Sequence, residues 1–329
     1  METPRNPTEL PPPPGVILSL KAGFDAIASH LAPILLPLGL DALLWLGPRL
    51  SLQQIFLAAF QDMLRVTGGT GFSAEELLAT QEFTTFLQRY NLLSLLRTFP
   101  IGITSLMTGE LPVDSPLGLR QVVEVVSVEQ VLVLVFGLTL LGWLGGGVYF
   151  RWVAAAAGYS ATGRGSAATV FQSLMFSLLC VAALFLLGIP LAGVLSILYL
   201  IGPSLAQMAL LALVFLGLWL AAPLFFLPHG IFVRGQNVLG SVLASLKMAR
   251  FTLPTSSLFV AAVFLISQGL NFLWAIPPDS SWMTAVGLAG HAFITTALLA
   301  ASFIYYRDMN VWLQTVLERL NAGTAPRQA

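Results

Sequence analysis

The chain has 329 residues, of which 57% are hydrophobic and only 9% are charged, and its 15 basic and 15 acidic side chains balance to zero net charge. A soluble protein carries roughly a quarter charged residues, so charges this sparse cannot cover the surface of a water-soluble globule. The balanced charge also excludes the basic surface that nucleic-acid binding requires, so we expect no nucleic-acid partner. The composition therefore predicts an integral membrane protein.

Residues 1–14 contain six prolines and no apolar run, so they are predicted to form a disordered tail. They lack the basic start, the apolar core and the small-residue cleavage site of a secretory signal. We therefore expect the first apolar helix to stay in the mature protein as a membrane anchor.

Transmembrane helices need roughly 20 apolar residues to cross about 30 Å of hydrocarbon. Six stretches meet or nearly meet this length: 30–47, 129–150, 168–190, 204–227, 255–276 and 283–305. The first is interrupted by Pro33 and Pro37. The third is followed by apolar residues 191–203, which fit either a kinked continuation or a re-entrant piece. The prediction is an all-α, polytopic helical membrane protein with about six transmembrane helices.

The spans divide the chain into five consecutive parts. These are the disordered tail at 1–14, a surface helix plus the first span at 15–47, an extracytoplasmic segment at 48–128, the other five spans at 129–306 and a cytoplasmic tail at 307–329.

The distribution of basic residues predicts the orientation, because cytoplasmic connections hold an excess of Lys and Arg. With the N-terminus inside, the cytoplasmic parts hold Arg5, Lys21, Arg151, Arg164, Arg234, Lys247, Arg250, Arg307, Arg319 and Arg327. The outer parts hold only Arg49, Arg65, Arg89, Arg97 and Arg120. The connections 151–167 and 228–254 contain no acidic residue. We therefore expect both termini in the cytoplasm and the chain in a bacterial inner membrane.

Amphipathic helices are predicted along the inner membrane surface at 16–31 and 238–251, with a weaker candidate at 166–173. Their basic residues Lys21, Lys247 and Arg250 are expected to contact anionic lipid headgroups. Each of these helices precedes a pair of spans. That order fits a threefold repeat, and it also fits independent basic helices wherever a loop meets the membrane.

The sequence NVLGSVLASLKMARFTLPTSSLFVAAVFLI at 237–266 joins a polar surface helix to a span. Over about residues 100–324, the chain resembles bacterial membrane families grouped around the membrane domain of glycerophosphodiester phosphodiesterases. The resemblance implies a six-helix fold, in families whose function is largely unknown. The long outer segment departs from the family pattern, and the phosphodiesterase domain has no counterpart in this sequence.

The outer segment is predicted to be helical. Ser73 and Glu76 have the spacing of a capping box, so a helix is expected to begin there. Apolar residues recur at helical spacing before and after it: Ile55, Phe56, Ala59, Met63, Phe83, Phe86, Leu87, Tyr90 and Leu93. These features predict a helical cap packed on the outer ends of the spans, with a lid over a lipid-accessible cavity as the alternative.

Asp41 lies within the first span, where an ionised carboxylate costs several kcal/mol. Counted from Trp45 and Trp274, Asp41 and Asn271 lie at nearly the same depth, and Gln268 lies one turn deeper. We therefore predict an intramembrane polar cluster of Asp41, Gln268 and Asn271. A hydrogen bond from Asp41 to Asn271 would join the first and fifth spans; the alternative is a polar substrate or proton site.

Gly142 and Gly146 form a GxxxG pair in the second span, which allows close approach of another backbone. Close packing inside the monomer is the first interpretation, and a homodimer face is the second.

No motif for catalysis, metal or cofactor binding is found. Residues 158–166 resemble a phosphate-binding loop but have Arg164 where lysine is required. The three histidines have no metal-binding spacing, and Cys180 is the only cysteine. We therefore predict a non-enzymatic scaffold or envelope-maintenance component that contacts membrane lipids and a membrane-protein partner or second copy. A transporter or lipid-handling protein is the alternative.

Overall fold

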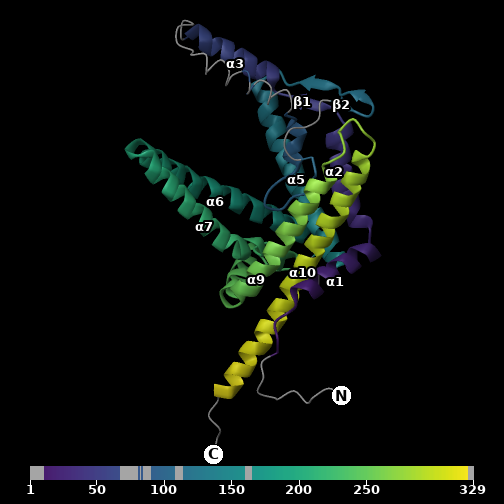
Figure 1. Cartoon of the computed structure of the whole chain (residues 1–329), viewed down its shortest axis with the longest axis vertical. Coiled ribbons are helices and arrows are strands. Elements are labelled where there is room, and N and C mark those ends of the chain that lie inside the picture. Colours follow the sequence, from purple (N-terminus) through teal and green to yellow (C-terminus); the bar gives the residue numbers. More distant parts are fainter. Residues whose placement is uncertain are drawn as a thin grey trace, which may run out of the picture. The chain divides into compact units, whose positions relative to one another are not determined.

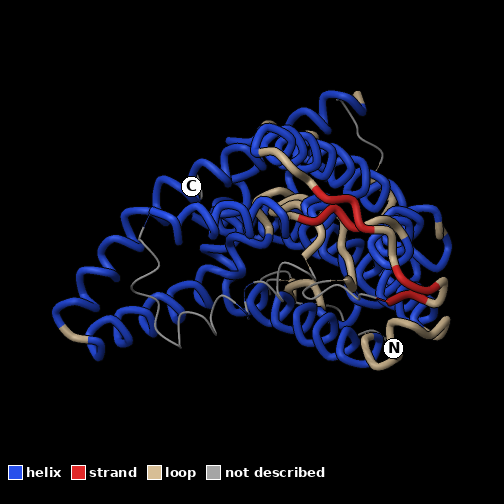
Figure 2. The backbone as a smooth tube through the Cα atoms, turned by 90° about the horizontal axis from the view of Figure 1, so that it is seen from above, coloured by secondary structure: helices blue, strands red, loops and turns tan. Residues whose placement is uncertain are grey.

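The computed structural model describes residues 11–66, 81, 83, 90–107, 114–159 and 165–324. Helices dominate this part of the chain, and its strands are few and short (Figure 2). Five of these helices are long and apolar enough to cross a membrane, or six if the broken pair Val16–Ser29 and Ala32–Leu46 is one span. The protein is therefore an all-α, polytopic membrane protein, as the sequence predicts.

The elements are labelled in Figure 1 where there is room. The helices are α1 (Val16–Ser29), η1 (Ala32–Ile34), α2 (Leu35–Leu46), α3 (Gln53–Val66), η2 (Leu92–Leu96), α5 (Val128–Ala156), α6 (Ser166–Ile201), α7 (Pro203–Phe225), α8 (His229–Arg234), α9 (Val238–Trp274) and α10 (Thr284–Thr324). The strands are β1 (Arg49–Ser51), β2 (Asp114–Ser115), β3 (Gly118–Leu119) and β4 (Val122–Glu124).

Several sequence predictions lie outside the described residues. They include residues 1–10 of the tail, the Ser73–Glu76 capping box and most of the helix expected after it. The last four residues of the predicted tail are described, and the Pro11 carbonyl accepts a hydrogen bond of 2.7 Å from Trp312 Nε1. The predicted C-terminal tail begins inside a helix, because α10 continues from the last span to Thr324.

The chain forms two compact units that each combine distant parts of the sequence. The first unit contains the chain up to His30, Arg151–Ile266 and the chain from Ala297 onward. The second unit contains Leu31–Phe150 and Ser267–Thr296. This division differs from the consecutive parts expected from the spans, because α5, α9 and α10 each contribute to both units.

In the first unit, α6 and α7 lie side by side (Figure 1). α6 continues through Pro190 to Ile201, and only Gly202 separates it from α7. Of the two alternatives for the residues after Pro190, the structure has the continued helix, which extends to Ile201, and not the re-entrant piece. A proline is tolerated inside a membrane helix when neighbouring groups satisfy the carbonyl that it frees. No side chain is buried in the most apolar stretch of α6, which is the pattern of a lipid-facing helix.

α9 contains the predicted surface helix and the fifth span, which meet at a kink. The kink lies at Thr252 (φ −127°, ψ 17°), two residues before Pro254, so the surface helix ends close to the predicted residue 251. Proline lacks an N–H and crowds the carbonyl four residues before it, which explains a break at this place. The Thr252 hydroxyl donates to the Met248 carbonyl at 2.8 Å and lies 2.9 Å from Ser256 Oγ, so hydroxyl groups on both sides of Pro254 are hydrogen-bonded at the kink.

Small and hydroxyl side chains at four-residue spacing are buried in α1 and in the N-terminal parts of α6 and α9. They are Ser19 and Gly23 in α1, Thr169, Ser173 and Ser177 in α6, and Ser241, Ser245 and Ala249 in α9. In α9, Ser241 and Ser245 donate to the carbonyls of Leu227 and Phe226, which lie just beyond the end of α7. The shared stripe is a feature that a threefold repeat would produce.

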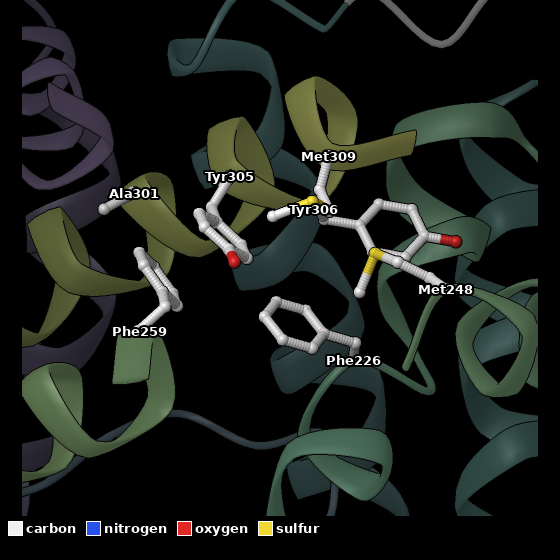
Figure 3. Close-up of a cluster of buried hydrophobic side chains, with 7 residues drawn as sticks. All are labelled: Phe226, Met248, Phe259, Ala301, Tyr305, Tyr306 and Met309. Atoms are coloured by element: carbon white, nitrogen blue, oxygen red, sulfur yellow. The ribbon is translucent and has the colours of Figure 1, made fainter. Parts of the chain in front are cut away.

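An aromatic core fills the first unit between the end of α7, α9 and α10 (Figure 3). It consists of Phe226, Met248, Phe259, Ala301, Tyr305, Tyr306 and Met309. Phe259 stacks on Tyr305 with ring centroids 4.2 Å apart, and Phe226 stacks on Tyr305 at 5.7 Å. Stacked rings bury large apolar areas and fix the directions of the helices that carry them.

In the second unit, two short strands near the two ends of residues 48–128 pair with each other. β1 pairs in parallel with β4, in the register Arg49 to Val122. Arg120, which is 9% exposed, donates from Nε and Nη2 to the Gly47 carbonyl at 3.1 and 2.9 Å, at the end of α2. Burial lowers the pKa of the Arg120 guanidinium, and the charge of Arg49 lowers it further. A cation at a helix C-terminus is favourable, so this outer arginine serves the fold.

Candidate functional site

A buried carboxylate forms the centre of the second unit. Asp41, on α2, is 0% exposed. Its Oδ1 accepts hydrogen bonds from the Ser105 hydroxyl and from the Met107 amide, the latter at 3.3 Å. Its Oδ2 accepts from the Leu106 amide at 3.0 Å. Both oxygens are therefore satisfied by one short segment of chain, which offsets the cost of burying a carboxylate.

The segment that binds Asp41 has no regular secondary structure. Residues 97–107 follow η2 and run along α5. The Trp143 indole on α5 donates to the Phe99 carbonyl at 3.1 Å, which joins this segment to the helix. We call residues 97–107 the inserted segment.

The glycine pair of α5 makes room for the inserted segment and for the end of η2. A Cβ atom at Gly146 would lie 2.7 Å from the Gly102 Cα and from the Ile101 carbonyl oxygen. A Cβ at Gly142 would lie 2.7 Å from the Leu96 carbonyl oxygen. The structure thus shows close packing inside the monomer at the GxxxG pair, and the backbone that approaches it is non-helical.

The inserted segment lies deep along the spanning helices. Thr104 Oγ1 is 2.9 Å from Thr295 Oγ1, and Thr295 lies eleven residues into α10, or about 16 Å along the helix axis. Non-helical backbone at this depth is tolerated only where protein or a water-filled cavity surrounds it. The segment 48–128 is therefore more than a cap on the outer ends of the spans.

A hydroxyl network continues from the inserted segment along α10. The Thr295 hydroxyl donates to the His291 carbonyl at 2.8 Å, so Thr104 is the donor in the bond between the two threonines. The Thr296 hydroxyl donates to the Ala292 carbonyl at 2.6 Å and accepts from the Tyr149 hydroxyl at 2.9 Å. Every hydroxyl in this network has a partner, as buried polar groups require.

One guanidinium outside the spans is electrostatically coupled to the site. Burial lowers the pKa of Arg97, and the carboxylate of Asp41 opposes that change. Arg97 lies at the start of the inserted segment, where its Nε donates weakly to the Ser94 carbonyl at 3.4 Å.

The predicted cluster of Asp41, Gln268 and Asn271 is not formed. Asp41 binds the inserted segment, whereas Asn271 Oδ1 lies 2.7 Å from His291 Nδ1. Gln268 is exposed on α9. The predicted hydrogen bond between Asp41 and Asn271 was wrong because depth along two helices does not determine which faces meet.

The predicted headgroup contacts Lys21, Lys247 and Arg250 are all exposed. The Arg250 guanidinium lies 5.8 Å from the centre of the Phe251 ring, in a cation–π contact. These positions leave all three cations accessible to lipid.

Across the described ranges, no group of three or more His, Cys, Asp or Glu side chains could hold a metal ion.

Sequence reasoning missed the partners of Asp41, although the signal was present. Residues 92–107, LLSLLRTFPIGITSLM, contain a single charged residue, Arg97, and are otherwise apolar or carry hydroxyls. The stretch is too short and too irregular for a span, so its apolar character was attributed to a cap. Low charge over sixteen residues was the indication that this part of the outer segment enters the membrane domain.

Neither a protein-family model, nor a curated protein, nor a solved structure matches this chain.

Proposed function

We propose that the protein is a non-enzymatic scaffold of the bacterial inner membrane that holds its extracytoplasmic segment rigidly on the membrane helices. The observation that carries the proposal is the complete burial of Asp41 with both oxygens satisfied by residues 105–107. A carboxylate on a transport pathway must meet water or substrate, whereas one that joins two parts of a fold is best kept dry. The resemblance to phosphodiesterase membrane domains stays a prediction.

The surroundings of Asp41 support the scaffold. Leu40, Leu44, Trp45, Met107 and Leu288 form an apolar cluster around this end of α2. Trp45 also donates to the Asp279 carbonyl at 2.8 Å and meets the Trp282 ring edge-on at 5.8 Å. This packing fastens α2 to the connection between α9 and α10 and encloses the carboxylate with apolar side chains.

A dry interior makes a direct prediction for chemical labelling. In a Cys180→Ala background, cysteines at Met107 and Ala292 should react with a small membrane-permeant thiol reagent at least about 100-fold more slowly than one at Leu119. Met107 and Ala292 are buried, whereas Leu119 is 84% exposed. Comparable rates at all three positions would indicate a hydrated path and would favour the transporter.

Lipid handling is a second candidate, favoured by one feature of the first unit. A groove of about 480 Å³ lies between α6 and α7 near Gly202, lined by apolar side chains together with Ser196, Tyr199 and Gln207. Its volume is in the range of small-molecule sites. A Leu210→Trp substitution that displaces a co-purified lipid and abolishes a growth phenotype, with the fold intact, would favour this function over the scaffold.

The proposed orientation, with both termini in the cytoplasm, rests on the basic connections 151–167 and 228–254. With Cys180 removed, a cysteine at Leu119 should be labelled by a membrane-impermeant maleimide in intact spheroplasts. A cysteine at the exposed Ser166 should be labelled only after permeabilisation. The opposite pattern would reverse the orientation.

A further inference from the structure

The contact between α9 and α10 in the second unit fixes the protonation of a histidine. Asn271 Oδ1 lies 2.7 Å from His291 Nδ1. An amide oxygen only accepts hydrogen bonds, so Nδ1 carries the proton and donates it to this bond. A neutral imidazole has one proton, so Nε2 of His291 is left with a lone pair.

That lone pair has no hydrogen-bond partner among the residues that the structure describes. His291 is 2% exposed, and its Nε2 atom is buried. The indole N–H of Trp274 is also buried and without an acceptor. Among the described residues of the contact between α9 and α10, one acceptor and one donor are thus unmatched, and buried polar groups are rarely left in this state.

Both groups belong to the same contact between the two helices. Trp274 lies three residues after Asn271, on the same face of α9. Its ring packs on Gly290, where a Cβ atom would lie 2.8 Å from the ring atoms Cε2 and Cζ2. Cε2 is bonded to Nε1, and Gly290 directly precedes His291, so both unmatched groups lie at the contact between the end of α9 and the same turn of α10.

We propose that His291 and Trp274 form a binding site for a hydroxyl group, which donates to His291 Nε2 and accepts from the indole N–H of Trp274. A hydroxyl has one donor and an acceptor oxygen, so it satisfies both groups at once. Water and a lipid that carries a free hydroxyl share this chemistry. The side chains around the hairpin tip, such as Phe272 and Trp282, are exposed, so a lipid can approach. The site does not depend on the scaffold function.

His229 in the first unit serves as the control for His291, because we expect no hydroxyl to bind at its second ring nitrogen. The Ser302 hydroxyl donates to the Leu299 carbonyl, so it accepts from His229 Nε2–H at 2.8 Å. Nδ1 of His229 is buried and makes no hydrogen bond of good geometry among the described residues, although the Phe226 carbonyl lies near the imidazole. Aromatic rings enclose this imidazole, with centroids at 5.0–5.6 Å: Phe225, Phe226, Phe303 and Tyr306. We expect the Nδ1 lone pair to stay unbound.

The test uses the full chain labelled with 15N-histidine in lipid nanodiscs. A lone pair that accepts a hydrogen bond resonates at lower 15N frequency than an unbound one. Three compositions are compared: phosphatidylcholine alone, phosphatidylcholine with phosphatidylglycerol, and phosphatidylcholine with phosphatidylmethanol. Phosphatidylmethanol has the charge of phosphatidylglycerol without its hydroxyls. His291→Gln and His229→Gln assign the signals.

We expect the 15N signal of His291 Nε2 to be shifted to lower frequency than that of His229 Nδ1. A shift in all three compositions identifies water as the source of the hydroxyl, and a shift only with phosphatidylglycerol identifies the lipid. Trp274→Phe should abolish or reduce the shift while the melting temperature shows that the protein is folded. A signal for His291 Nε2 at the frequency of an unbound lone pair in every composition would overturn the proposal. A shift unchanged by Trp274→Phe would do the same.

Discussion

Replacing Asp41 with leucine is expected to lower the free energy of unfolding in detergent by about 3 kcal/mol, because three hydrogen-bond donors lose their acceptor in a buried site. The Ser105 hydroxyl can rotate toward another acceptor, but the amides of Leu106 and Met107 are fixed by the backbone. The inserted segment should then detach from α2 and become sensitive to protease. Melting temperature and limited proteolysis measure the two effects.

The Asp41→Asn variant tests whether Asp41 acts through its hydrogen bonds or through its charge. Asp41→Asn keeps one acceptor oxygen but points an NH2 group at a donor, so we expect an intermediate loss of about 1 kcal/mol. Asp25, which is exposed on α1, provides the control, and Asp25→Leu should leave the melting temperature unchanged. If Asp41→Asn abolished a growth phenotype at an unchanged melting temperature, the carboxylate would act through its charge, and the transporter would replace the scaffold.

Replacing Gly146 with leucine is expected to cost at least about 3 kcal/mol, the upper part of the range for overpacked sites. The new Cβ would lie 2.7 Å from the backbone of Gly102 and of Ile101, and backbone atoms cannot move aside as a flexible side chain can. Gly146→Ala introduces the same Cβ and should already destabilise the protein. Thermal unfolding in detergent gives the difference between the variants.

Gly137 on the same helix provides the matched control. A Cβ at Gly137 would meet nothing within 4 Å, so Gly137→Leu should not lower stability. Leucine has a higher helix propensity than glycine by up to about 1 kcal/mol, so a small gain is the expected sign. Equal losses for Gly137→Leu and Gly146→Leu would show that the inserted segment does not lie on α5. A change of oligomeric state confined to Gly146→Leu, with stability unchanged, would instead indicate a dimer face.

The sequence by itself determined the class of the protein and most of its helices. Low charge and long apolar stretches are local properties, and backbone groups in hydrocarbon must be satisfied within each helix, so composition and length suffice to predict spans. The helix at 53–66 and the surface helix that begins at Val16 followed from the same periodic patterns. Orientation and the family resemblance stay predictions.

Only the tertiary structure decided which polar groups meet. Asp41 was recognised as a residue that requires a partner, but the partner came from residues 105–107, more than sixty positions along the chain. Likewise, the glycine pair of α5 predicted that another backbone segment lies close to this helix, but it did not predict which segment. Hydrophobic burial in a membrane protein is non-directional and specifies depth, whereas a hydrogen bond specifies a rotation of each helix about its axis. That rotation is set by packing between distant segments, and it made Ser105 the partner of Asp41 and left Asn271 for His291.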